Sequence, residues 1–459
     1  MAKREAKKNL KSLNIDAKVT KGGLTVIVNG KEFSITYPRE IWQKYPAKAK
    51  EALKDNAAYS STIFLPQMFD LTKIYYQTAR PLSETFLFKN GIYDMPCCAI
   101  ADEKSSLGYV KKFFNTQYIF ADNKIKTARN NFHKKTMPAA IIPFSFGKES
   151  LLSAALCREI GIKPILVNFI EPANEFEYFH KKKLIKKFEA ETGLKVYTIE
   201  YGPGILRYGK YWNLETELGW GLQTTEYSML SVPLADYFKA DYIILGNEQS
   251  CNDVFFNKEG VLTYKAGYDQ HGDWTPQQGL LASLIAGRKI EVISFMEPLY
   301  EIAITKILHG RYPEYGKYQM SCMADNEKAK TNRWCQYCVK CGYIFALGSA
   351  FNIDLKKIGF TENLFDREHA SVYEHFFKYD PQAPAYGSEE ELGLAFYLAC
   401  LKGRSGYSID LFKKTKLKKF ERNQKKLIKK YLGITPGWIL PNGLTKKILK
   451  IYQQELSRL

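Results

Sequence analysis

Residues 139–161 read AAIIPFSFGKESLLSAALCREIG, and this stretch decides the fold. Its start, AAIIPFS (139–145), is an apolar run typical of a buried strand. Its end, SLLSAALCREIG (150–161), has helical periodicity and stops at Gly161, a residue that favours helix termination. The hexapeptide SFGKES (145–150) therefore connects a strand to a helix, and this unit predicts an α/β fold.

The same alternation continues along the chain. Buried strands are predicted at 164–170, 195–200 and 241–246, and helices at 174–193 and 226–238. Strands and helices in regular succession are typical of a doubly wound parallel sheet. Ligands of such sheets bind at the carboxyl ends of the strands. We therefore expect the active site to be formed by the segments that follow these strands, with the hexapeptide among them.

The segments on either side of this unit have different patterns. Leu24–Val28 and Glu32–Tyr37 flank Asn29-Gly30, a pair typical of a tight β-hairpin turn. Beyond Phe351 the pattern is mostly helical. We predict an N-terminal α+β domain over residues 1–135, an α/β domain with the cysteine cluster over 136–350, and a helical C-terminal region with a basic tail over 351–459.

The C-terminal region contains a basic run from Lys413 to Lys430. Apolar residues recur within and just after it at helical spacing, namely Leu417, Phe420, Leu427, Ile428 and Tyr431. This spacing is typical of an amphipathic helix that docks on a core, so we favour a docking helix over an RNA-binding arm.

The composition limits the class of protein. Apolar residues make up 45% of the chain and aromatic residues 14%, and no stretch approaches about 18 uninterrupted apolar residues, which argues against disorder and against a membrane span. Residues 1–15 are basic but have no apolar core, so no secretory signal is expected and the cytoplasm is the expected location. The net charge of +19 favours phosphorylated small molecules or RNA as partners, although a solvated lysine-rich surface has the same charge.

The hexapeptide has the composition of a phosphate-binding loop. Backbone N–H groups and the positive end of the following helix dipole would point toward one place, which suits pyrophosphate. Gly147 would let the backbone approach phosphates, Ser145 and Ser150 offer hydroxyls, Lys148 adds charge, and Glu149 could hold a magnesium ion. The loop is neither a Walker P-loop nor a dinucleotide fingerprint, because both glycine patterns are missing. The alternative is an ordinary strand-to-helix turn capped by Ser145.

Four of the nine cysteines lie within residues 322–341. They are Cys322, Cys335, Cys338 and Cys341, and the spacing of the last three lets their thiolates converge on one ion, with the first completing a tetrahedron. We predict a structural zinc site, with an iron–sulfur cluster as the alternative. The remaining cysteines are expected to be small buried hydrophobes, namely Cys97, Cys98, Cys157, Cys251 and Cys400.

The hexapeptide also resembles a known signature. It is similar to the Ser-Gly-Gly-x-Asp-Ser motif of PP-loop ATPases, which attack the α-phosphate of ATP and release pyrophosphate. Two positions depart from the motif, because Phe146 replaces the second small residue and Glu149 replaces the aspartate. The resemblance implies a HUP-like, doubly wound parallel sheet and extends over about residues 140–390.

Two PP-loop families pair such a loop with a cysteine cluster. One is the 7-cyano-7-deazaguanine synthase family; the other is the ATP-dependent epimerase that acts on UDP-N-acetylmuramoyl-L-alanyl-L-glutamate in peptidoglycan synthesis, and the chain looks closer to the epimerase. The segments that carry this resemblance are Gly246–Ser250, Met296–Leu308, Ser321-Cys322, Trp334–Phe351 and, more weakly, Pro384–Glu391. Cys251 and Asn252 depart from the family pattern. Membership would imply a role in cell wall biogenesis and cell shape.

The resemblance implies a reaction and its cofactors. ATP would convert the terminal glutamate carboxylate into an acyl-adenylate, the α-proton would be removed and returned on the other face, and water would release AMP and the D-product. The expected cofactors are ATP, Mg²⁺ and structural Zn²⁺. The expected partner is the UDP-linked muropeptide, with no membrane partner, and nucleic acid is not favoured.

The resemblance also implies roles for particular residues. Ser145, Gly147, Lys148, Glu149 and Ser150 are assigned to the triphosphate, and Asn168, which ends the next strand, is assigned to the nucleotide. The predicted catalytic residues are Lys148 together with Asn247, Glu248 and Ser250, which leave the carboxyl end of a strand where substrate or magnesium would lie. The base that moves the α-proton stays open among Glu248, Cys251 and Tyr268.

Two other functions remain open from the sequence. Another carboxylate-adenylating PP-loop enzyme, similar to 7-cyano-7-deazaguanine synthase or modifying tRNA, would make the +19 charge an RNA footprint. The departures at Phe146 and Glu149 are also compatible with a non-catalytic scaffold that binds nucleotide.

Overall fold

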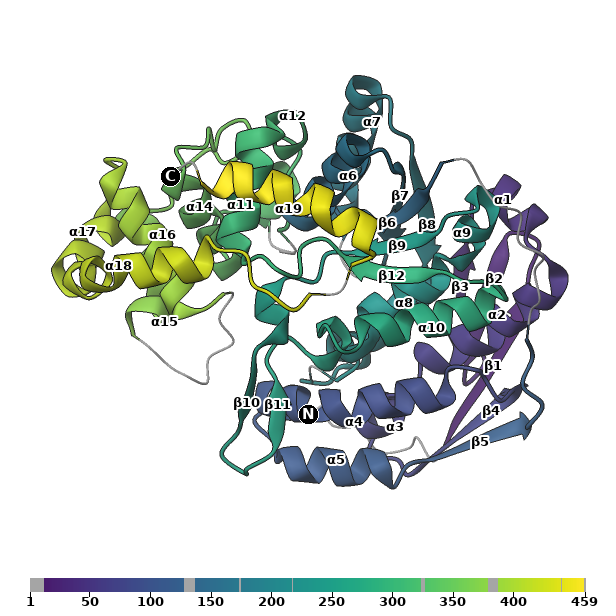
Figure 1. Ribbon diagram of the computed structural model, residues 1–459. Coiled ribbons are helices and arrows are strands. Elements are labelled where there is room, and N and C mark those ends of the chain that lie inside the picture. Colours follow the sequence, from purple (N-terminus) through teal and green to yellow (C-terminus); the bar gives the residue numbers. More distant parts are fainter. Residues whose placement is uncertain are drawn as a thin grey trace.

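The structure, a computed structural model, is a mixed α/β protein built on one large sheet (Figure 1). It describes residues 12–127, 137–172, 175–216, 218–322, 327–378, 387–438 and 440–457. Within this part of the chain, ten strands form the sheet in the order β12-β9-β6-β7-β8-β3-β2-β1-β4-β5. The strands are β1 Leu13–Val19, β2 Gly23–Val28, β3 Lys31–Thr36, β4 Lys73–Ala79, β5 Gln117–Asp122, β6 Ala139–Pro143, β7 Lys163–Ile170, β8 Val196–Tyr201, β9 Tyr242–Leu245 and β12 Glu291–Ser294.

The predicted parallel α/β sheet is confirmed. Strands β8, β7, β6, β9 and β12 are parallel neighbours, and in chain order they are the third, second, first, fourth and fifth strands of this half of the sheet. The chain therefore reverses its direction of travel across the sheet between β6 and β9. In open α/β sheets, the crevice outside the carboxyl ends at such a reversal is the usual ligand site.

Helices cover both faces of this half of the sheet. Ala140 and Ile142 of β6 belong to one hydrophobic core, whereas Ala139 and Ile141 belong to the other, as the alternation of a strand requires. The first core also contains residues of α6 Lys148–Ile160, α7 Glu175–Thr192 and α11 Glu301–Arg311. The second contains residues of α8 Gln223–Leu230, α9 Val232–Phe238 and α10 Thr275–Ala286. The sheet is thus doubly wound.

The N-terminal strands extend the same sheet. The predicted hairpin is confirmed as β2 and β3, with Asn29 at φ +48° and Gly30 at φ +82° in the turn. Strand β3 pairs antiparallel with β8, so the sheet is continuous across the predicted boundary at residue 136. The helices of this part are α1 Arg39–Lys44, α2 Ala47–Ser60, α3 Leu65–Met68, α4 Glu84–Ala101 and α5 Ser106–Phe114. The division into domains stays a prediction.

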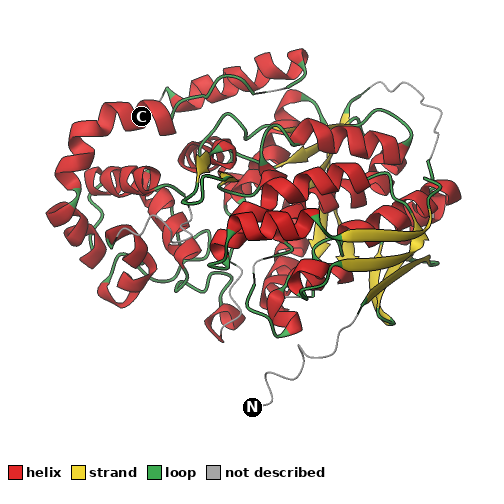
Figure 2. Ribbon diagram, turned by 90° about the horizontal axis from the view of Figure 1, so that it is seen from below, coloured by secondary structure: helices red, strands yellow, loops and turns green. Residues whose placement is uncertain are grey.

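The C-terminal region is helical, as predicted, and lies at the side of the molecule away from β1–β5 (Figures 1 and 2). Its helices, with those that precede it, are α12 Pro313–Gly316, α13 Glu327–Thr331, α14 Val339–Ala350, α15 Glu374–Phe377, α16 Glu389–Leu401, α17 Tyr407–Thr415, α18 Leu417–Tyr431 and α19 Asn442–Leu456. In the basic run, α18 buries Phe420, Leu427 and Tyr431, so it is a docking helix. The last helix, α19, returns to the α/β half, where the Tyr452 hydroxyl donates to the Phe295 carbonyl at 2.7 Å.

Two local features differ from the sequence prediction. The single helix expected over 226–238 is two helices, α8 and α9, because Pro233, the second residue of α9, has no N–H with which to continue α8. A two-stranded ribbon, β10 Val254–Phe256 and β11 Leu262–Tyr264, follows the end of β9 and was not predicted. Among the described residues, no helix combines the length and apolarity that crossing a bilayer requires.

Candidate active site at the carboxyl edge of the sheet

The predicted phosphate loop lies between β6 and α6, at the point where the strand order reverses. Ser145 is exposed, and its hydroxyl oxygen accepts a hydrogen bond from the Gly147 N–H at 3.3 Å. Gly147 is the N-cap residue of α6, and Ser150 donates its hydroxyl back to the Gly147 carbonyl at 3.1 Å. The loop is therefore a tight turn at the positive end of a 13-residue helix.

Phe146, the departure from the PP-loop signature, does not block this turn. Its φ is +64°, a left-handed conformation that glycine adopts without strain. Its ring is fully buried and packs against Phe144 and Phe188, with ring centroids 4.7 and 5.8 Å away. The aromatic side chain is thus an anchor in the core, and the left-handed backbone that a glycine would supply is retained.

Lys148 is buried at the start of α6 and forms ion pairs with Glu149 and Glu301. Burial alone would lower the pKa of Lys148, but the two carboxylates outweigh it and raise the pKa, so the ammonium stays charged. Burial likewise opposes ionisation of Glu149, yet the neighbouring Lys148 charge lowers the pKa of this carboxyl. The loop therefore presents a permanent cation held between two carboxylates.

The end of β9 contacts this loop directly. A Cβ atom at Gly246 would lie 2.7 Å from the Cβ of Glu149, so only glycine permits the approach. Asn247 follows and is buried; its amide donates to the Thr275 hydroxyl at 3.4 Å, and its carbonyl accepts from the Ser294 hydroxyl at 2.6 Å. The structure thus brings together two predicted segments that are separated by about a hundred residues.

Glu248 is buried and oriented by its own turn. Its carboxylate accepts from the Ser250 N–H at 2.7 Å and from the Ser250 hydroxyl. Burial, and then the charges of Glu301 and Glu391, raise its pKa well above the usual value. Ser250 therefore orients the Glu248 carboxylate, and its buried, acid-rich surroundings favour binding of a proton there.

Glu301 and Glu391 were missed as site residues. Glu391 is fully buried; burial and the Glu301 charge raise its pKa to about 7, and its carboxylate accepts from the Ile302 N–H at 2.8 Å. Burial, and then the charges of Glu301 and Glu391, raise the pKa of the buried Tyr343 hydroxyl well above its usual value. Both glutamates lie in segments that carry the sequence resemblance to the epimerase family. Glu301 lies in Met296–Leu308 and Glu391 in Pro384–Glu391, of which residues 384–386 lie outside the described residues.

Three further residues predicted for the site, Asn168, Cys251 and Tyr268, differ in what they contact. Asn168 is buried and donates to the Phe144 carbonyl at 2.7 Å, so its amide ties the ends of β7 and β6 together. Cys251 is buried beside Glu248, with its sulfur 3.8 Å from the carboxylate, and burial raises the thiol pKa. Tyr268 packs its ring on Tyr264 and Trp274, and its hydroxyl accepts from Gln277 at 3.4 Å. Of the base candidates, Glu248 and Cys251 therefore lie together.

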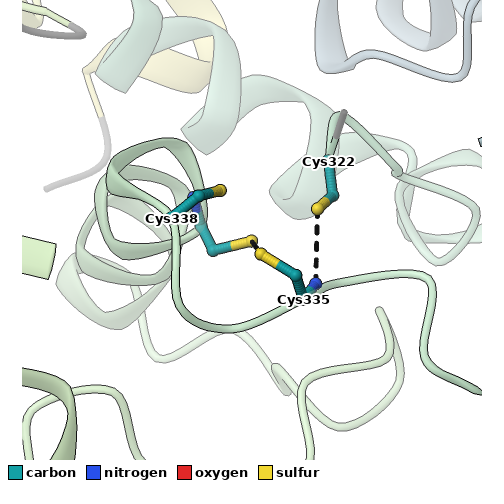
Figure 3. A group of neighbouring side chains, drawn as sticks. Cys322, Cys335 and Cys338 are labelled. Carbon is teal, nitrogen blue, oxygen red and sulfur yellow. Dashed lines mark hydrogen bonds between the residues drawn. The ribbon is translucent and has the colours of Figure 1, made fainter. Parts of the chain in front are cut away.

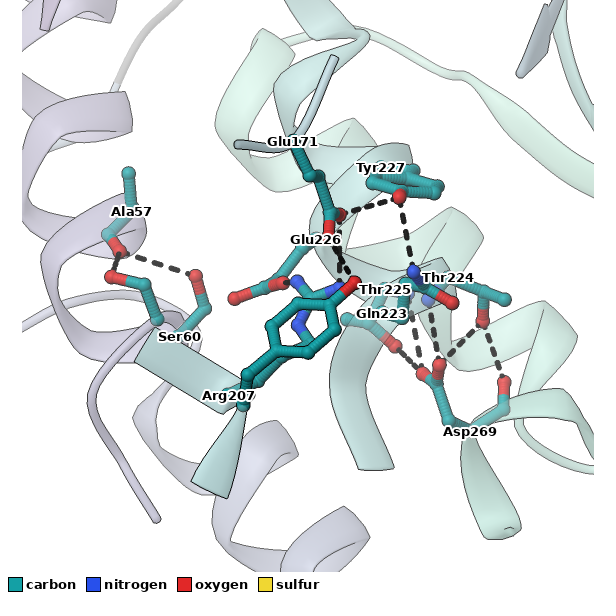
Figure 4. Close-up of polar contacts among 12 residues, drawn as sticks. Ala57, Ser60, Glu171, Arg207, Gln223, Thr224, Thr225, Glu226, Tyr227 and Asp269 are labelled. Atoms are coloured by element: carbon teal, nitrogen blue, oxygen red, sulfur yellow. Dashed lines mark hydrogen bonds and ion pairs between the residues drawn. The ribbon is translucent and has the colours of Figure 1, made fainter. Parts of the chain in front are cut away.

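A second buried polar network follows β7 and β8 on the same edge of the sheet (Figure 4). Arg207 forms ion pairs with Glu171, at 3.0 Å, and with Glu226, and Glu171 also accepts from the Tyr227 hydroxyl at 2.6 Å. Burial raises the pKa of Glu226 to about 7. In the same view, the Asp269 carboxylate accepts from the backbone and hydroxyl groups of the residues before Glu226. This network joins segments that are distant in the sequence, and no local sequence signal marked it.

The four predicted cysteines converge (Figure 3). Their sulfur atoms all lie within 4.8 Å of one another, and no other group of this kind is found among the described residues. The sulfurs of Cys335 and Cys341 are 3.7 Å apart, and backbone N–H groups donate to Cys322 at 3.3 Å and to Cys338 at 3.4 Å. The cluster can therefore hold a metal ion such as zinc.

The cysteine cluster is connected to the predicted phosphate loop. Two residues before Cys322, the Met320 N–H donates to the Phe146 carbonyl at 2.9 Å. The Ser321 hydroxyl lies 3.9 Å from the position that a Cβ of Gly147 would occupy. A metal at the cysteines would therefore fix the segment that supports the loop.

Comparison with protein-family models and with curated proteins gave no match to this chain. Function must therefore be inferred from the residues of the site itself. The site combines a helix N-terminus, one permanently charged lysine, a carboxylate of high pKa and further buried acids at the reversal of the strand order.

Proposed function

We propose that the chain is an AMP-forming epimerase of the PP-loop type. It would adenylate the terminal L-glutamate of UDP-N-acetylmuramoyl-L-alanyl-L-glutamate and invert its α-carbon, in the cytoplasm, as a step of peptidoglycan synthesis. The observation that carries the proposal is the contact between Gly246 and Glu149, which joins the hexapeptide to the Asn247–Ser250 turn at the strand-order reversal. A nucleotide and an acceptor held in these two segments would be adjacent.

In this proposal the triphosphate of ATP binds at the N-terminus of α6. The backbone N–H groups of the loop, the hydroxyls of Ser145 and Ser150 and the Lys148 ammonium would neutralise it. Among the described residues, the one group of three or more side chains placed to hold a metal ion is the cysteine cluster. An Mg²⁺ ion would use one or two carboxylates, with Glu149 of the loop as our candidate, and complete its shell with phosphate oxygens and water.

The chemistry requires activation before proton transfer. A carboxylate oxygen of the substrate attacks the α-phosphorus and pyrophosphate leaves. The resulting acyl-adenylate, a mixed anhydride, makes the α-proton more acidic because its carbonyl no longer carries a full negative charge. Glu248 is our candidate to take this proton, since its pKa lies well above that of an ordinary glutamate. Return of a proton on the other face and hydrolysis of the acyl-adenylate give the D-product and AMP.

We assign zinc to the cysteine cluster, in a structural role. Four sulfurs at a Zn–S distance of about 2.3 Å stand about 3.8 Å apart in a regular tetrahedron. The Cys335–Cys341 separation of 3.7 Å fits this edge. In a [4Fe–4S] cluster each thiolate binds a separate iron and the sulfurs stand further apart, so a single ion is favoured over such a cluster.

The deciding experiment offers the purified protein UDP-N-acetylmuramoyl-L-alanyl-L-glutamate with ATP and Mg²⁺. The proposal expects AMP and pyrophosphate to form, and chiral analysis to find D-glutamate in the hydrolysed product. AMP formation only with a nucleobase carboxylate or a tRNA would support the rival adenylating enzyme instead. ATP binding without AMP from any acceptor would support a scaffold.

Salt dependence separates the two adenylating functions further. Binding to tRNA releases counterions, so it weakens steeply between about 50 and 200 mM salt. A UDP-linked peptide contacts few charges and would show a shallower dependence. We expect the Michaelis constant for the muropeptide to change little over this range.

A further inference from the structure

A groove of about 540 Å³ lies beside the candidate active site. It is bounded by α10, by β12 with its flanking residues, and by the segment that enters α19, and Figure 1 shows these three elements side by side. Its lining includes Thr275, Gly279, Leu280, Glu297 and Leu440. Its volume falls in the range typical of small-molecule sites, about 300–1,000 Å³.

The inner end of the groove reaches the site described above. Thr275 lines the groove and accepts the hydrogen bond of Asn247, which follows β9. Glu297 lies at the same end, three residues beyond the carboxyl end of β12, and β12 is the sheet neighbour of β9. A ligand in the groove would therefore have one end next to Thr275, the hydrogen-bond partner of Asn247.

Small residues on α10 create the space. A Cβ atom at Gly279 would lie 3.0 Å from the Val292 nitrogen, so this helix position packs closely on β12 and leaves no side chain in the groove. Leu280 stands at the wall with 53% of its surface exposed, and Leu440 faces it from the α19 segment. The walls thus present apolar surface that small alkyl groups of a ligand would cover.

Glu297 supplies the groove with a carboxyl group that can still form hydrogen bonds. It is half-buried and has no hydrogen-bond or ion-pair partner among the described residues. Its carboxylate lies 2.3 Å from the position that a Cβ of Gly272 would occupy, so a glycine at 272 makes room for it. Burial and the charge of Asp273 raise its pKa to about 7, so near neutral pH this carboxyl can accept a hydrogen bond or donate one. A peptide amide offers both partners.

We propose that this groove binds the peptide chain that precedes the reacting carboxylate, with a backbone amide on Glu297 and alkyl groups against Leu280 and Leu440; the inference rests on the proposed adenylating function. The ligand class is an acyl-dipeptide whose terminal carboxylate points toward Asn247. Binding energy from this part of the substrate, which does not react, would hold the carboxylate in place for attack on ATP.

The test is calorimetric binding of UDP-N-acetylmuramoyl-L-alanyl-L-glutamate without ATP. In Leu280→Trp a bulky ring fills the groove from an exposed position, so we expect the dissociation constant to rise about tenfold. Leu284→Trp is the matched control, because Leu284 lies one turn further along α10, is 39% exposed and does not line the groove. Binding that is equal in the two variants overturns the proposal, as does absence of binding to the wild type.

A second pair of variants tests the polar contact. Glu297→Leu should weaken binding, whereas Glu297→Gln, which keeps an acceptor and a donor, should restore most of it. Equal loss in both variants overturns the assignment of an amide to this residue. AMP release by the wild type in the same preparation tests the proposed function separately. If the wild type turns over and Leu280→Trp binds the muropeptide as tightly as the wild type, the groove assignment is wrong and the enzyme assignment stands. If the wild type releases no AMP, the enzyme assignment is wrong.

Discussion

Lys148 and Glu301 form an ion pair that joins the first residues of α6 and α11. At the other ends of the same two helices, Glu159 pairs with Arg311 at 2.5 Å. Helices α6 and α11 are therefore connected by an ion pair at each end, one buried at the phosphate loop and one at the surface. The buried pair fixes Lys148 at the place where phosphate charge would be neutralised.

Glu301→Gln should reduce pyrophosphate release by about 10- to 100-fold, because Lys148 would lose one of the two carboxylates that orient it. Lys148→Ala should abolish release, whereas Glu248→Ala, which removes the candidate base, should abolish the formation of D-glutamate in chiral analysis. Glu159→Gln is the matched control, since it removes the surface pair between the same helices and should leave turnover unchanged. The measurement is pyrophosphate release at saturating muropeptide. Wild-type pyrophosphate release in Lys148→Ala, or wild-type formation of D-glutamate in Glu248→Ala, would remove that residue from the mechanism.

The left-handed backbone of Phe146 predicts an inverted order of stability between two variants. Phe146→Gly and Phe146→Ala both empty the core and should each cost about 3–5 kcal/mol. At φ +64° glycine is unstrained, so Phe146→Gly should be the more stable of the two by about 1 kcal/mol. Denaturant titration of both proteins gives this difference.

Phe144 provides the control for that comparison. It is buried two residues earlier and is not among the residues with positive φ, so glycine has no conformational advantage there. Phe144→Ala should therefore be more stable than Phe144→Gly, by about 0.5–1 kcal/mol. The same order at both positions would contradict a left-handed loop at Phe146.

Local sequence patterns predicted the elements of the α/β half but not their assembly. The apolar run 139–145 and the Asn29-Gly30 turn carry their own signals, because burial and positive φ demand particular residue types at particular spacings. The pairing of β3 with β8 has no such signal, since it joins strands whose separation of more than 150 residues leaves no periodicity to detect. The continuity of the sheet across residue 136 was therefore not predictable.

For the candidate site too, the sequence predicted the local segments but not the contacts between distant ones. The hexapeptide and the Gly246–Ser250 turn each follow a predicted strand, and a parallel sheet must bring such segments to one edge. Glu301, which is 153 residues from Lys148 in sequence, begins a helix and would ordinarily be taken as a solvated first-turn acid. Its role as a partner of Lys148 depends on how α11 packs on α6, and sequence periodicity does not fix that packing.

The pKa of Glu226 predicts a pH dependence of stability. The pKa is raised from 4.5 to about 7, mainly by burial, so between these values the folded protein binds more protons than the unfolded chain. This contribution is fully present below pH 4.5 and is lost as the pH rises through 7. Relative to Glu226→Gln, the wild type should lose on the order of 3 kcal/mol of unfolding free energy over this window. Denaturant titrations at several pH values measure this loss, and an equal pH dependence of stability in the two proteins would be evidence against a raised pKa of Glu226.

The cysteine cluster predicts that metal and ATP binding are linked. The purified protein should contain about one zinc ion per chain and no iron, and Cys341→Ser or chelation should lower the melting temperature by about 5 °C or more. Because Met320, two residues before Cys322, donates to the Phe146 carbonyl, metal loss should also loosen the phosphate loop and raise the Michaelis constant for ATP. Cys400→Ser is the control, since Cys400 lies outside the cluster. The proposed link between the metal and the loop would be contradicted if Cys341→Ser and Cys400→Ser changed the melting temperature and the Michaelis constant for ATP equally. Full ATP affinity after zinc removal would also contradict it.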